Sequence, residues 1–306
     1  MNGFVVPILK EAEWTSHDAV QRLRSVLGVQ EIGHAGSLDP FATGVLVCGV
    51  GRGTKIIALL MDLPKEYAGT IRLGRITDTG DRTGAILEER GVGEIGIERA
   101  REAAGELTGV LEQVPPMVSA IKQRGTRLYD LARRGIEVER KPRRVEVHSF
   151  DVLSIAGDLV EFRIRCGRGT YVRALARDFG ERLGPGACVE ELRRTAIGTF
   201  TENDAVALTG SMEDQRARAL AAAIPLARAL AHMPSLRLRP EWVRKVRQGG
   251  QPPWRGVEAT ELPAGERVCL IGTEGDLIAI ASVSAVPGLA DRSWRDSWEL
   301  KLARVL

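Results

Sequence analysis

Apolar residues recur at helical spacing in the segment that begins at Ser16. Val20, Leu23 and Leu27 lie three or four residues apart, and Gly28 follows the last of them. Residues with this spacing share one face of an α-helix, serine is a common N-terminal cap, and glycine commonly ends a helix. The pattern predicts an amphipathic helix from Ser16 to Leu27, with Ser16 as its cap.

The same periodicities predict further helices and strands along the chain. Helical spacing is found over 54–63, 97–107, 171–183, 212–232 and 241–247. Alternation or a short apolar run predicts strands over 45–50, 67–73, 145–153, 159–166, 267–271, 277–283 and 298–305. Strands and helices alternate without a regular β-α-β repeat, and after residue 232 short β-prone pieces dominate. We therefore expect two domains, 1–231 and 232–306, of which the second is small and β-rich.

Composition and cysteine usage are those of an ordinary globular protein. Of 306 residues, 44% are hydrophobic and 27% charged, which excludes disordered, collagen-like and coiled-coil classes. The four cysteines are widely spaced and form no Cys-x-x-Cys pair, so a disulfide scaffold or zinc site is not expected. No run approaches 18 apolar residues, and no basic residue precedes the apolar N-terminal stretch. These features predict a soluble protein of the cytoplasm.

Positive charge is concentrated in one segment. The whole chain has a net charge of +3, but residues 122–144 contain nine basic and only three acidic side chains. Such a segment is a candidate for contact with an RNA phosphate backbone, and the alternative is a solvated helix face. The basic residues are Lys122, Arg124, Arg127, Arg133, Arg134, Arg140, Lys141, Arg143 and Arg144.

Asp39 is the first candidate for chemistry. It lies in the loop 33–44, which contains three glycines and a proline and precedes a buried strand. Such a loop can hold a carboxylate at the mouth of a cleft, although an Asp-Pro pair also stabilises ordinary turns. The chain has neither a GxxxxGK[ST] phosphate loop nor a GxSxG elbow, so nucleotide-cofactor and serine-hydrolase chemistry find no support.

The sequence 33–46, Gly-His-Ala-Gly-Ser-Leu-Asp-Pro-Phe-Ala-Thr-Gly-Val-Leu, resembles the GHxGxLDPxATGxL signature of the TruB family of pseudouridine synthases. Further motifs follow in the family's order, and together they span residues 1 to about 200. They are Thr15–Asp18, Lys65–Tyr67, Thr77–Asp81, Pro115–Ala120, Gly125–Tyr129, Ala132–Gly135, Gly169–Arg173 and Leu192–Thr195. One pattern departs from the family: its N-terminal DKPxGxTS is Leu9 to Ser16 here and lacks both the Pro and the Gly.

The resemblance implies isomerisation of a uridine in RNA, in which the N1 glycosidic bond breaks and the ring rejoins through C5. It implies that Asp39 is the nucleophile, that Arg173 forms an ion pair with it, and that Tyr67 stacks on the extruded base. It further implies that Tyr171 and Leu192 line the uracil pocket and that His34 fills the space the base leaves. No cofactor or metal is expected.

The resemblance also implies the fold and the substrate. We expect an α+β pseudouridine synthase fold, with a mixed central sheet and an active-site cleft lined by Asp39, Tyr67 and Arg173. Residues 114–144 would be an insertion that clamps the RNA, and 232–306 a PUA-like RNA-binding domain. The expected substrate is uridine 55 in the T loop of tRNA, modified by a monomer without a guide RNA. The alternatives are a dyskerin-type enzyme that needs a guide RNA and a non-catalytic RNA-binding or RNA-folding protein.

Overall fold

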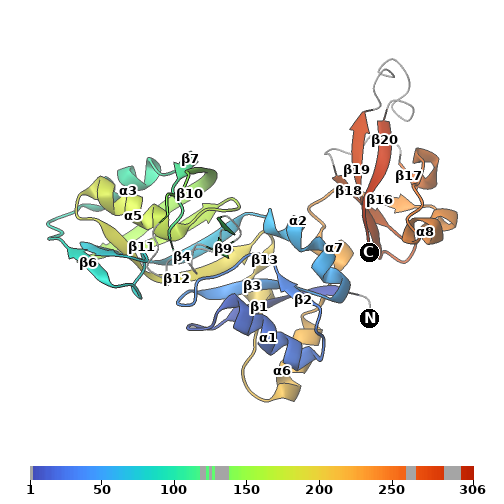
Figure 1. The fold of residues 1–306 in the computed structure, drawn as a ribbon, viewed down its shortest axis with the longest axis horizontal. Helices are drawn as coiled ribbons and strands as arrows, with labels where there is room; N and C mark the ends of the chain where they lie inside the picture. Colours follow the sequence, from blue (N-terminus) through green and yellow to red (C-terminus); the bar gives the residue numbers. More distant parts are fainter. Residues whose placement is uncertain (1–2, 118–121, 124–125, 128–137, 260–266, 286–297) are drawn as a thin grey trace.

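The computed structural model describes residues 3–117, 122–123, 126–127, 138–259, 267–285 and 298–306. Within them, a large sheet crosses the main body, and a smaller sheet forms a separate lobe at the C-terminal end (Figure 1). The predicted combination of a mixed central sheet and a β-rich C-terminal part is confirmed. The division of the chain at residue 232 remains a prediction.

Eleven strands form the large sheet, in the order β14-β1-β3-β12-β4-β11-β10-β7, with β13, β15 and β2 pairing onto β12, β1 and β3. The β1–β14 and β12–β3 pairs are parallel and the other pairs antiparallel. The strands are β1 (Phe4–Lys10), β2 (Ile32–His34), β3 (Thr43–Val50), β4 (Lys65–Leu73), β7 (Gly109–Gln113), β10 (Arg143–Ala156), β11 (Leu159–Cys166), β12 (Ala187–Ile197), β13 (Phe200–Thr201), β14 (Val206–Ala207) and β15 (Ile224–Pro225).

The remaining elements of the main body are helices and two small hairpins. The hairpins pair β5 (Arg75–Thr77) with β6 (Ile86–Glu89), and β8 (Lys122–Gln123) with β9 (Thr126–Arg127). The helices are α1 (Ser16–Leu27), α2 (Ile57–Met61), α3 (Ile97–Gly105), α5 (Val172–Leu183), α6 (Met212–Ala221) and α7 (Leu226–Ala229).

Helices cover the two halves of the large sheet separately (Figure 1). Strand β11 alternates buried and exposed residues, and its Phe162 and Ile164 pack in one core with Phe179 of α5 and Ala103 of α3. Helix α1 places Leu23 in a second core, built on strands β1 and β3. Burial of these apolar stripes supplies most of the stability of such a layered fold.

Helix α1 spans the predicted residues, but its cap is Thr15 and not Ser16. The Thr15 hydroxyl accepts a hydrogen bond from the backbone N–H of Asp18 at 3.1 Å, and the Asp18 carboxylate accepts one from Thr15 N at 2.9 Å. This reciprocal pair is a capping box. Ser16 Oγ instead accepts a hydrogen bond from Leu38 N at 2.8 Å, which ties the helix to the loop that carries Asp39.

Two predicted helices were wrong in extent. Over 54–63 only Ile57–Met61 is α-helical, because residues Gly51–Ile56 form a tighter 3₁₀ turn in which Thr54 Oγ1 donates to Gly51 O at 2.7 Å. The helix expected over 212–232 ends at Ala221. Pro225 follows, and its ring and missing N–H cannot be accommodated inside a helix.

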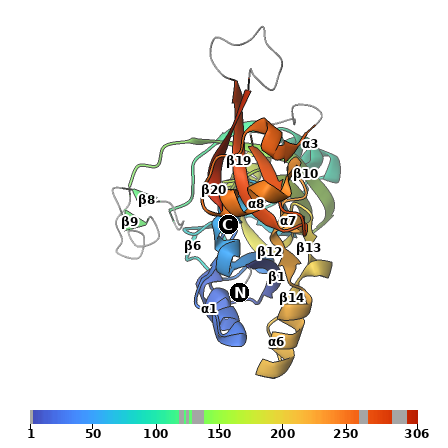
Figure 2. The same cartoon turned by 90° about the vertical axis from the view of Figure 1, so that its right-hand side faces the viewer.

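The C-terminal lobe is built on a five-stranded sheet in the order β17-β16-β18-β19-β20 (Figure 2). These strands are β16 (Ser235–Leu238), β17 (Val257–Glu258), β18 (Arg267–Ile271), β19 (Leu277–Ala285) and β20 (Trp298–Val305), and helix α8 (Pro240–Arg247) packs against them. The lobe contacts the main body through Arg304, whose Nη1 donates to Lys55 O at 3.0 Å.

All four cysteines are buried and free. Among the described residues, no helix is both long and apolar enough to span a membrane.

Candidate active site

Asp39 lies in the loop between β2 and β3, where the chain changes direction before the buried strand. Its backbone carbonyl accepts a hydrogen bond from Ala42 N at 3.1 Å, which closes a turn around Pro40. The side chain is 34% exposed, although the neighbouring Leu38 and Phe41 are buried. The loop therefore exposes the Asp39 carboxylate to solvent, while the neighbouring apolar side chains are buried.

Arg173 meets this carboxylate from the first turn of α5. Its Nε lies 2.8 Å from Asp39 Oδ2, and its Nη2 donates to Asp39 Oδ1 at 2.9 Å. The arginine side chain is only 2% exposed, so this two-pronged ion pair is shielded from water on the arginine side. Although 134 residues separate the two positions in sequence, the fold brings them into direct contact.

Asp81 holds Arg173 from the opposite side, and sequence reasoning did not select it. Arg173 Nη1 donates to Thr79 O at 2.7 Å and lies 3.4 Å from Asp81 Oδ2. The buried Asp81 also accepts hydrogen bonds from Thr79 Oγ1 at 2.9 Å and Thr83 N at 3.0 Å. The sequence does contain a hint of Asp81, which is the last residue of the Thr-Asp-Thr-Gly-Asp motif. Nothing in the sequence indicates that its partner is Arg173.

Two opposing influences set the ionisation of Asp39. Burial raises the pKa of its carboxyl above the ordinary value, and the Arg173 guanidinium lowers it. The nearby Asp81 adds to the rise, because a second negative charge disfavours ionisation. The net direction is upward, and the Arg173 guanidinium limits this rise.

A second arginine, Arg194 of β12, fixes the backbone of the Asp39 loop. Its Nη2 and Nη1 donate to Gly36 O at 3.0 Å and Ser37 O at 3.2 Å. Its Nε donates to Val45 O at 2.8 Å on the far side of the loop. The side chain is 1% exposed, and these carbonyls provide the hydrogen bonds that a buried cation requires. Sequence reasoning quoted the Leu-Arg-Arg-Thr motif but did not select Arg194.

Lys10 supports the same loop from the end of β1. Its Nζ donates to Pro40 O at 3.0 Å and Trp14 O at 2.6 Å. Burial lowers the pKa of Lys10 to about 8, and the Asp39 carboxylate opposes this fall. Loop and lysine are therefore coupled through both the backbone and the charge of Asp39.

The departure from the family's N-terminal pattern has a visible consequence at Glu13. This position corresponds to the glycine of DKPxGxTS, and Glu13 has a φ of +65°, the one positive φ of a non-glycine residue among those described. Its backbone N–H still donates to Pro40 O at 2.9 Å. The backbone thus keeps the left-handed conformation that glycine adopts readily, and the exposed Glu13 bears the steric cost.

We therefore expect the substitution Glu13→Gly to stabilise the protein by about 1 kcal/mol, because relief of the left-handed strain exceeds the entropy that glycine adds to the unfolded chain. Urea unfolding measures this change. The matched control is Glu11→Gly, also exposed but without a positive φ, which should be neutral or destabilising. An equal effect of the two substitutions would contradict the strain at Glu13.

Tyr67 and Leu192 lie together beside the Asp39 loop. Both belong to the apolar core that also contains Leu38 and Phe41, the neighbours of Asp39. They are 9% and 7% exposed, so only their outer edges are open to a ligand. Burial raises the pKa of the Tyr67 hydroxyl, which therefore stays protonated at neutral pH.

Tyr171 and His34 lie next in sequence to the helix that carries Arg173 and to the loop that carries Asp39. Tyr171 is the residue immediately before α5, and Gln113 fixes its backbone by accepting from Tyr171 N at 2.8 Å and donating to Tyr171 O at 3.1 Å. His34 ends the short strand β2 and is half-buried. Burial lowers the pKa of His34, so its ring is neutral at pH 7.

The basic segment is only partly described. Arg124, Arg133 and Arg134 lie outside the described residues, and Lys122 and Arg127 are placed only as backbone in β8 and β9. Lys141, Arg143 and Arg144 are exposed. Arg140 Nη1 donates to Pro115 O at 3.1 Å and so joins the two ends of the insertion.

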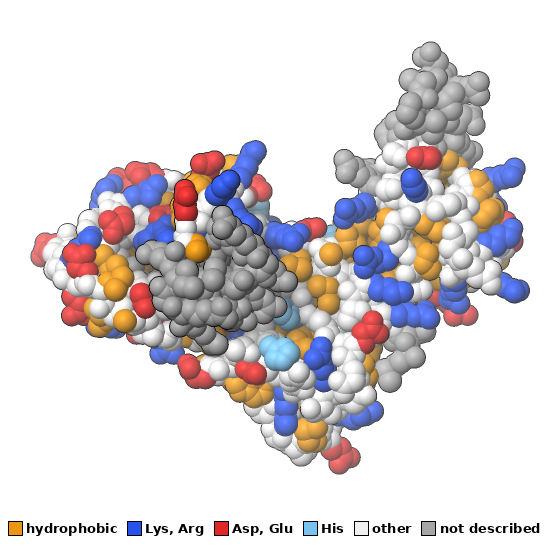
Figure 3. All heavy atoms as spheres, in the orientation of Figure 1, with side chains coloured by type: hydrophobic (Ala, Val, Ile, Leu, Met, Phe, Trp, Pro, Cys, Tyr) orange, Lys and Arg blue, Asp and Glu red, His pale blue; other side chains and the backbone are white. Residues whose placement is uncertain are grey.

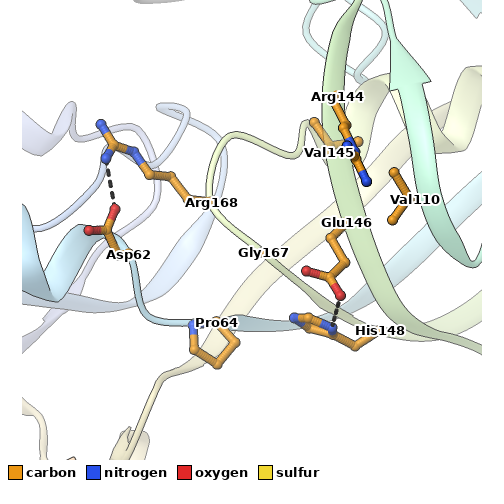
Figure 4. Close-up of a pocket in the computed structure, with 9 residues that line it drawn as sticks. All are labelled: Asp62, Pro64, Val110, Arg144, Val145, Glu146, His148, Gly167 and Arg168. Atoms are coloured by element: carbon orange, nitrogen blue, oxygen red, sulfur yellow. Dashed lines mark hydrogen bonds and ion pairs between the residues drawn. The ribbon is translucent and has the colours of Figure 1, made fainter. Parts of the chain in front are cut away.

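Two cavities are lined by residues of the main body. The smaller, of about 420 Å³, is lined in part by Phe41 and Thr43, which follow Asp39 in the chain, and by Leu192 of β12. The larger, of about 610 Å³, lies where β4 begins and β11 ends (Figure 4). Asp39 lines neither of them and reaches solvent directly. In the described part of the chain, no three His, Cys, Asp or Glu side chains are placed to hold a metal ion.

Comparison with known proteins gives a consistent result. A model described as TruB family pseudouridylate synthase, N-terminal domain, matches residues 24–172, and the tRNA pseudouridylate synthase B C-terminal domain matches 173–230. The tRNA pseudouridine synthase B of Geobacter sulfurreducens is 43% identical, with 100% of this chain and 99% of that protein covered. That of Geotalea uraniireducens is 40% identical, over 100% of this chain and 97% of that protein.

Solved structures share the fold. A Cbf5-Nop10-Gar1 complex contains a chain that matches with a TM-score of 0.75 and 25% identity, over 99% of this chain and 84% of that chain. An H/ACA RNP bound to a substrate RNA containing 2′-deoxyuridine gives a TM-score of 0.72 at 22% identity, with the same coverage. At that identity the second likeness concerns the fold alone.

Proposed function

Because this chain belongs to the TruB family of pseudouridine synthases, we propose that it isomerises uridine to pseudouridine at position 55 in the T loop of tRNA. One observation carries the proposal most directly. The partly exposed Asp39 carboxylate is gripped by the buried Arg173 in the loop whose sequence carries the family signature. This arrangement offers an accessible nucleophile whose ionised form is stabilised by the Arg173 guanidinium.

The reaction breaks the bond between uracil N1 and ribose C1′ and forms a bond between C5 and C1′. The proton that C5 loses is balanced by the proton that N1 gains, so no external reductant or oxidant is required. Asp39 attacks either C1′ or C6 in its ionised form, and Arg173 stabilises that form through the ion pair. Lys10 and Arg194 keep the loop in place while the charge of Asp39 changes.

The target base must leave the RNA stack before Asp39 can reach it. We propose that the extruded uracil stacks on the open edge of Tyr67 and meets the apolar edge of Leu192, with Tyr171 completing the pocket. His34, neutral at pH 7, would occupy the space left in the RNA loop. The common core of Tyr67 and Leu192 beside Asp39 supports this arrangement.

We further propose that the enzyme acts as a monomer in the cytoplasm, without a cofactor, metal ion or guide RNA. A single chain supplies Asp39, Arg173 and Tyr67, which supports the monomer. Residues 232–306 would form a PUA-like RNA-binding domain, and Figure 3 shows Lys and Arg side chains gathered on that lobe, which suits a polyanionic partner.

The basic insertion makes a testable prediction about salt dependence. We expect the double substitution Arg143→Glu and Arg144→Glu to weaken tRNA binding and to reduce the slope of log K against log salt by roughly 2, since about one counterion is released per phosphate contact. Titration at several salt concentrations measures the slope. The control is Arg101→Glu on α3, which should leave it unchanged. An unaltered slope in the double variant would show that this part of the basic insertion does not contact the RNA backbone.

The function itself is tested with the purified full chain and an unmodified T-arm stem-loop RNA, without any guide RNA. We expect pseudouridine at the position of uridine 55, detected by chemical mapping of the modified base. Product only after addition of a guide RNA would support the dyskerin-type alternative. Binding without product under any condition would support a non-catalytic RNA-binding protein.

A further inference from the structure

We propose that Gln113 is a positioning residue of the reaction, which sets the place of Tyr171 in the uracil pocket through the backbone of that tyrosine. This inference rests on the proposed function, because it concerns the pocket in which the extruded uracil is isomerised. Gln113 is the last residue of β7, and sequence reasoning did not select it.

The Gln113 side chain pairs with Tyr171 as a neighbouring strand would. Its Oε1 accepts a hydrogen bond from Tyr171 N at 2.8 Å, and its Nε2 donates one to Tyr171 O at 3.1 Å. A side-chain amide carries an acceptor and donors on the same carbon, so it can bind both backbone groups of one residue. Two such bonds fix the orientation of the tyrosine backbone, whereas one bond would let it rotate.

Burial makes this pair persistent. Gln113 is 3% exposed, and a buried amide that loses its partners is not compensated by water. The side chain therefore stays on the Tyr171 backbone. Tyr171 itself is only half-buried, so part of it remains open to a ligand. The glutamine thus holds a pocket residue from the closed side of the pocket.

The Tyr171 backbone needs an external anchor because it lies in a loop. Strand β11 ends at Cys166 and helix α5 begins at Val172, and between them Gly169 has a φ of +85°. Tyr171 is extended, with φ −104° and ψ 111°, and its carbonyl accepts from Ala174 N in the first turn of α5. Gln113 ties this loop residue to a strand of the large sheet.

The anchor lies where the basic insertion begins. Gln113 pairs with Arg143 of β10, and the chain leaves β7 directly after it. Pro115 is buried, and its carbonyl accepts from Arg140 Nη1 at 3.1 Å at the other end of the insertion. The proposed RNA clamp and the uracil pocket therefore share one fixed point, at Gln113.

The role of Gln113 can be separated from that of Arg173. Although Arg173 follows Tyr171 by two residues, its guanidinium has its own anchors, since Nη1 donates to Thr79 O at 2.7 Å and Nη2 to Asp39 Oδ1 at 2.9 Å. Loss of the Gln113 amide should release Tyr171 and leave this ion pair in place. The expected signature is a lower kcat with an unchanged acid limb of the pH profile.

The test uses the full chain with Gln113→Met, which keeps the length of the side chain and removes both hydrogen bonds. On a T-arm stem-loop we expect single-turnover kcat to fall about tenfold, since small misplacements in a site have effects of this order. RNA binding should stay within about twofold, and the acid limb measured from about pH 5 to pH 9 should not move. If Gln113→Met does not fold, Gln113→Asn, one methylene too short for both bonds, is expected to give the same pattern.

The matched control is Gln215→Met, which removes an equally buried and doubly bonded glutamine from α6. Gln215 is 0% exposed, donates to Gly210 O at 2.7 Å and accepts from Arg22 Nε at 2.9 Å. Both variants should lose stability in urea unfolding, but Gln215→Met should keep the wild-type kcat. An equal fall of kcat in the two variants would reduce Gln113 to a structural residue and overturn the inference.

A double-mutant cycle shows whether Gln113 acts through Tyr171. We expect the combination of Gln113→Met with Tyr171→Leu to have the kcat of Tyr171→Leu alone, because the glutamine then has no phenol ring to position. Effects that multiply, or an acid limb that moves in Gln113→Met, would overturn the assignment. If the wild type makes no pseudouridine in the stem-loop, the proposed function has failed instead, so the two failures are distinguishable.

Discussion

The substitution Asp39→Asn should abolish pseudouridine formation, lowering kcat by at least about 10³-fold, and should leave RNA binding within about tenfold. Asparagine has nearly the same shape as aspartate and can still accept a hydrogen bond from Arg173. It lacks the negative charge that attack on ribose C1′ or uracil C6 requires. Because phosphate contacts dominate affinity for RNA, one uncharged side chain at the target base changes binding little.

The measurement is single-turnover isomerisation of a T-arm stem-loop, together with equilibrium binding of the same RNA. Asp151→Asn provides the matched control, since Asp151 is an exposed aspartate on β10 away from the Asp39 loop. It should keep wild-type turnover. If Asp39→Asn turned over at the wild-type rate, another group would have to be the nucleophile.

Much of the fold follows from local pattern. The spacing of Val20, Leu23 and Leu27 locates α1, and the alternation over 159–166 gives β11. The predictions from local pattern fail where tertiary contacts override the local preference of the sequence. Ser16 does not cap α1 because its hydroxyl bonds to the backbone of Leu38, 22 residues away, and Thr15 takes its place.

The candidate site is less accessible to sequence reasoning. Asp39 was selected from its glycine-containing loop, but only the family resemblance paired it with Arg173, because periodicity says nothing about contacts across 134 residues. Arg194 escaped selection for another reason. A buried arginine whose partners are three backbone carbonyls has no complementary charge in the sequence that would reveal it.

The supporting residues explain how a loop can hold a reactive carboxylate. Lys10 and Arg194 hold the loop by hydrogen bonds to backbone carbonyls on its two flanks, and the Asp39 carboxylate itself stays 34% exposed. Arg173 forms the direct ion pair with Asp39, and Asp81 in turn contacts the Nη1 atom of Arg173. Positioning and electrostatic support are therefore assigned to different side chains, and substitutions can separate them.

Replacing Arg173 provides that separation. We expect Arg173→Met to destabilise the fold by about 3–5 kcal/mol, since it leaves the buried Asp81 and the Asp39 carboxylate without their shared cation. Removing the guanidinium also removes the influence that lowers the pKa of Asp39, so this pKa rises further above its ordinary value. At any given pH below that raised pKa, a smaller fraction of Asp39 is ionised.

The acid limb of kcat/KM should therefore move to higher pH in Arg173→Met, and by less in Arg173→Lys, which retains a positive charge but loses the two-pronged geometry. The profile is measured from about pH 5 to pH 9 on the T-arm stem-loop. Arg177→Met is the control on the same helix, because Arg177 pairs with the adjacent Asp178 and should leave the limb in place. If Arg173→Met proves too unstable to assay, Arg173→Lys still reports the direction. An acid limb unchanged in both variants would mean that Arg173 stabilises the loop without controlling the charge of Asp39.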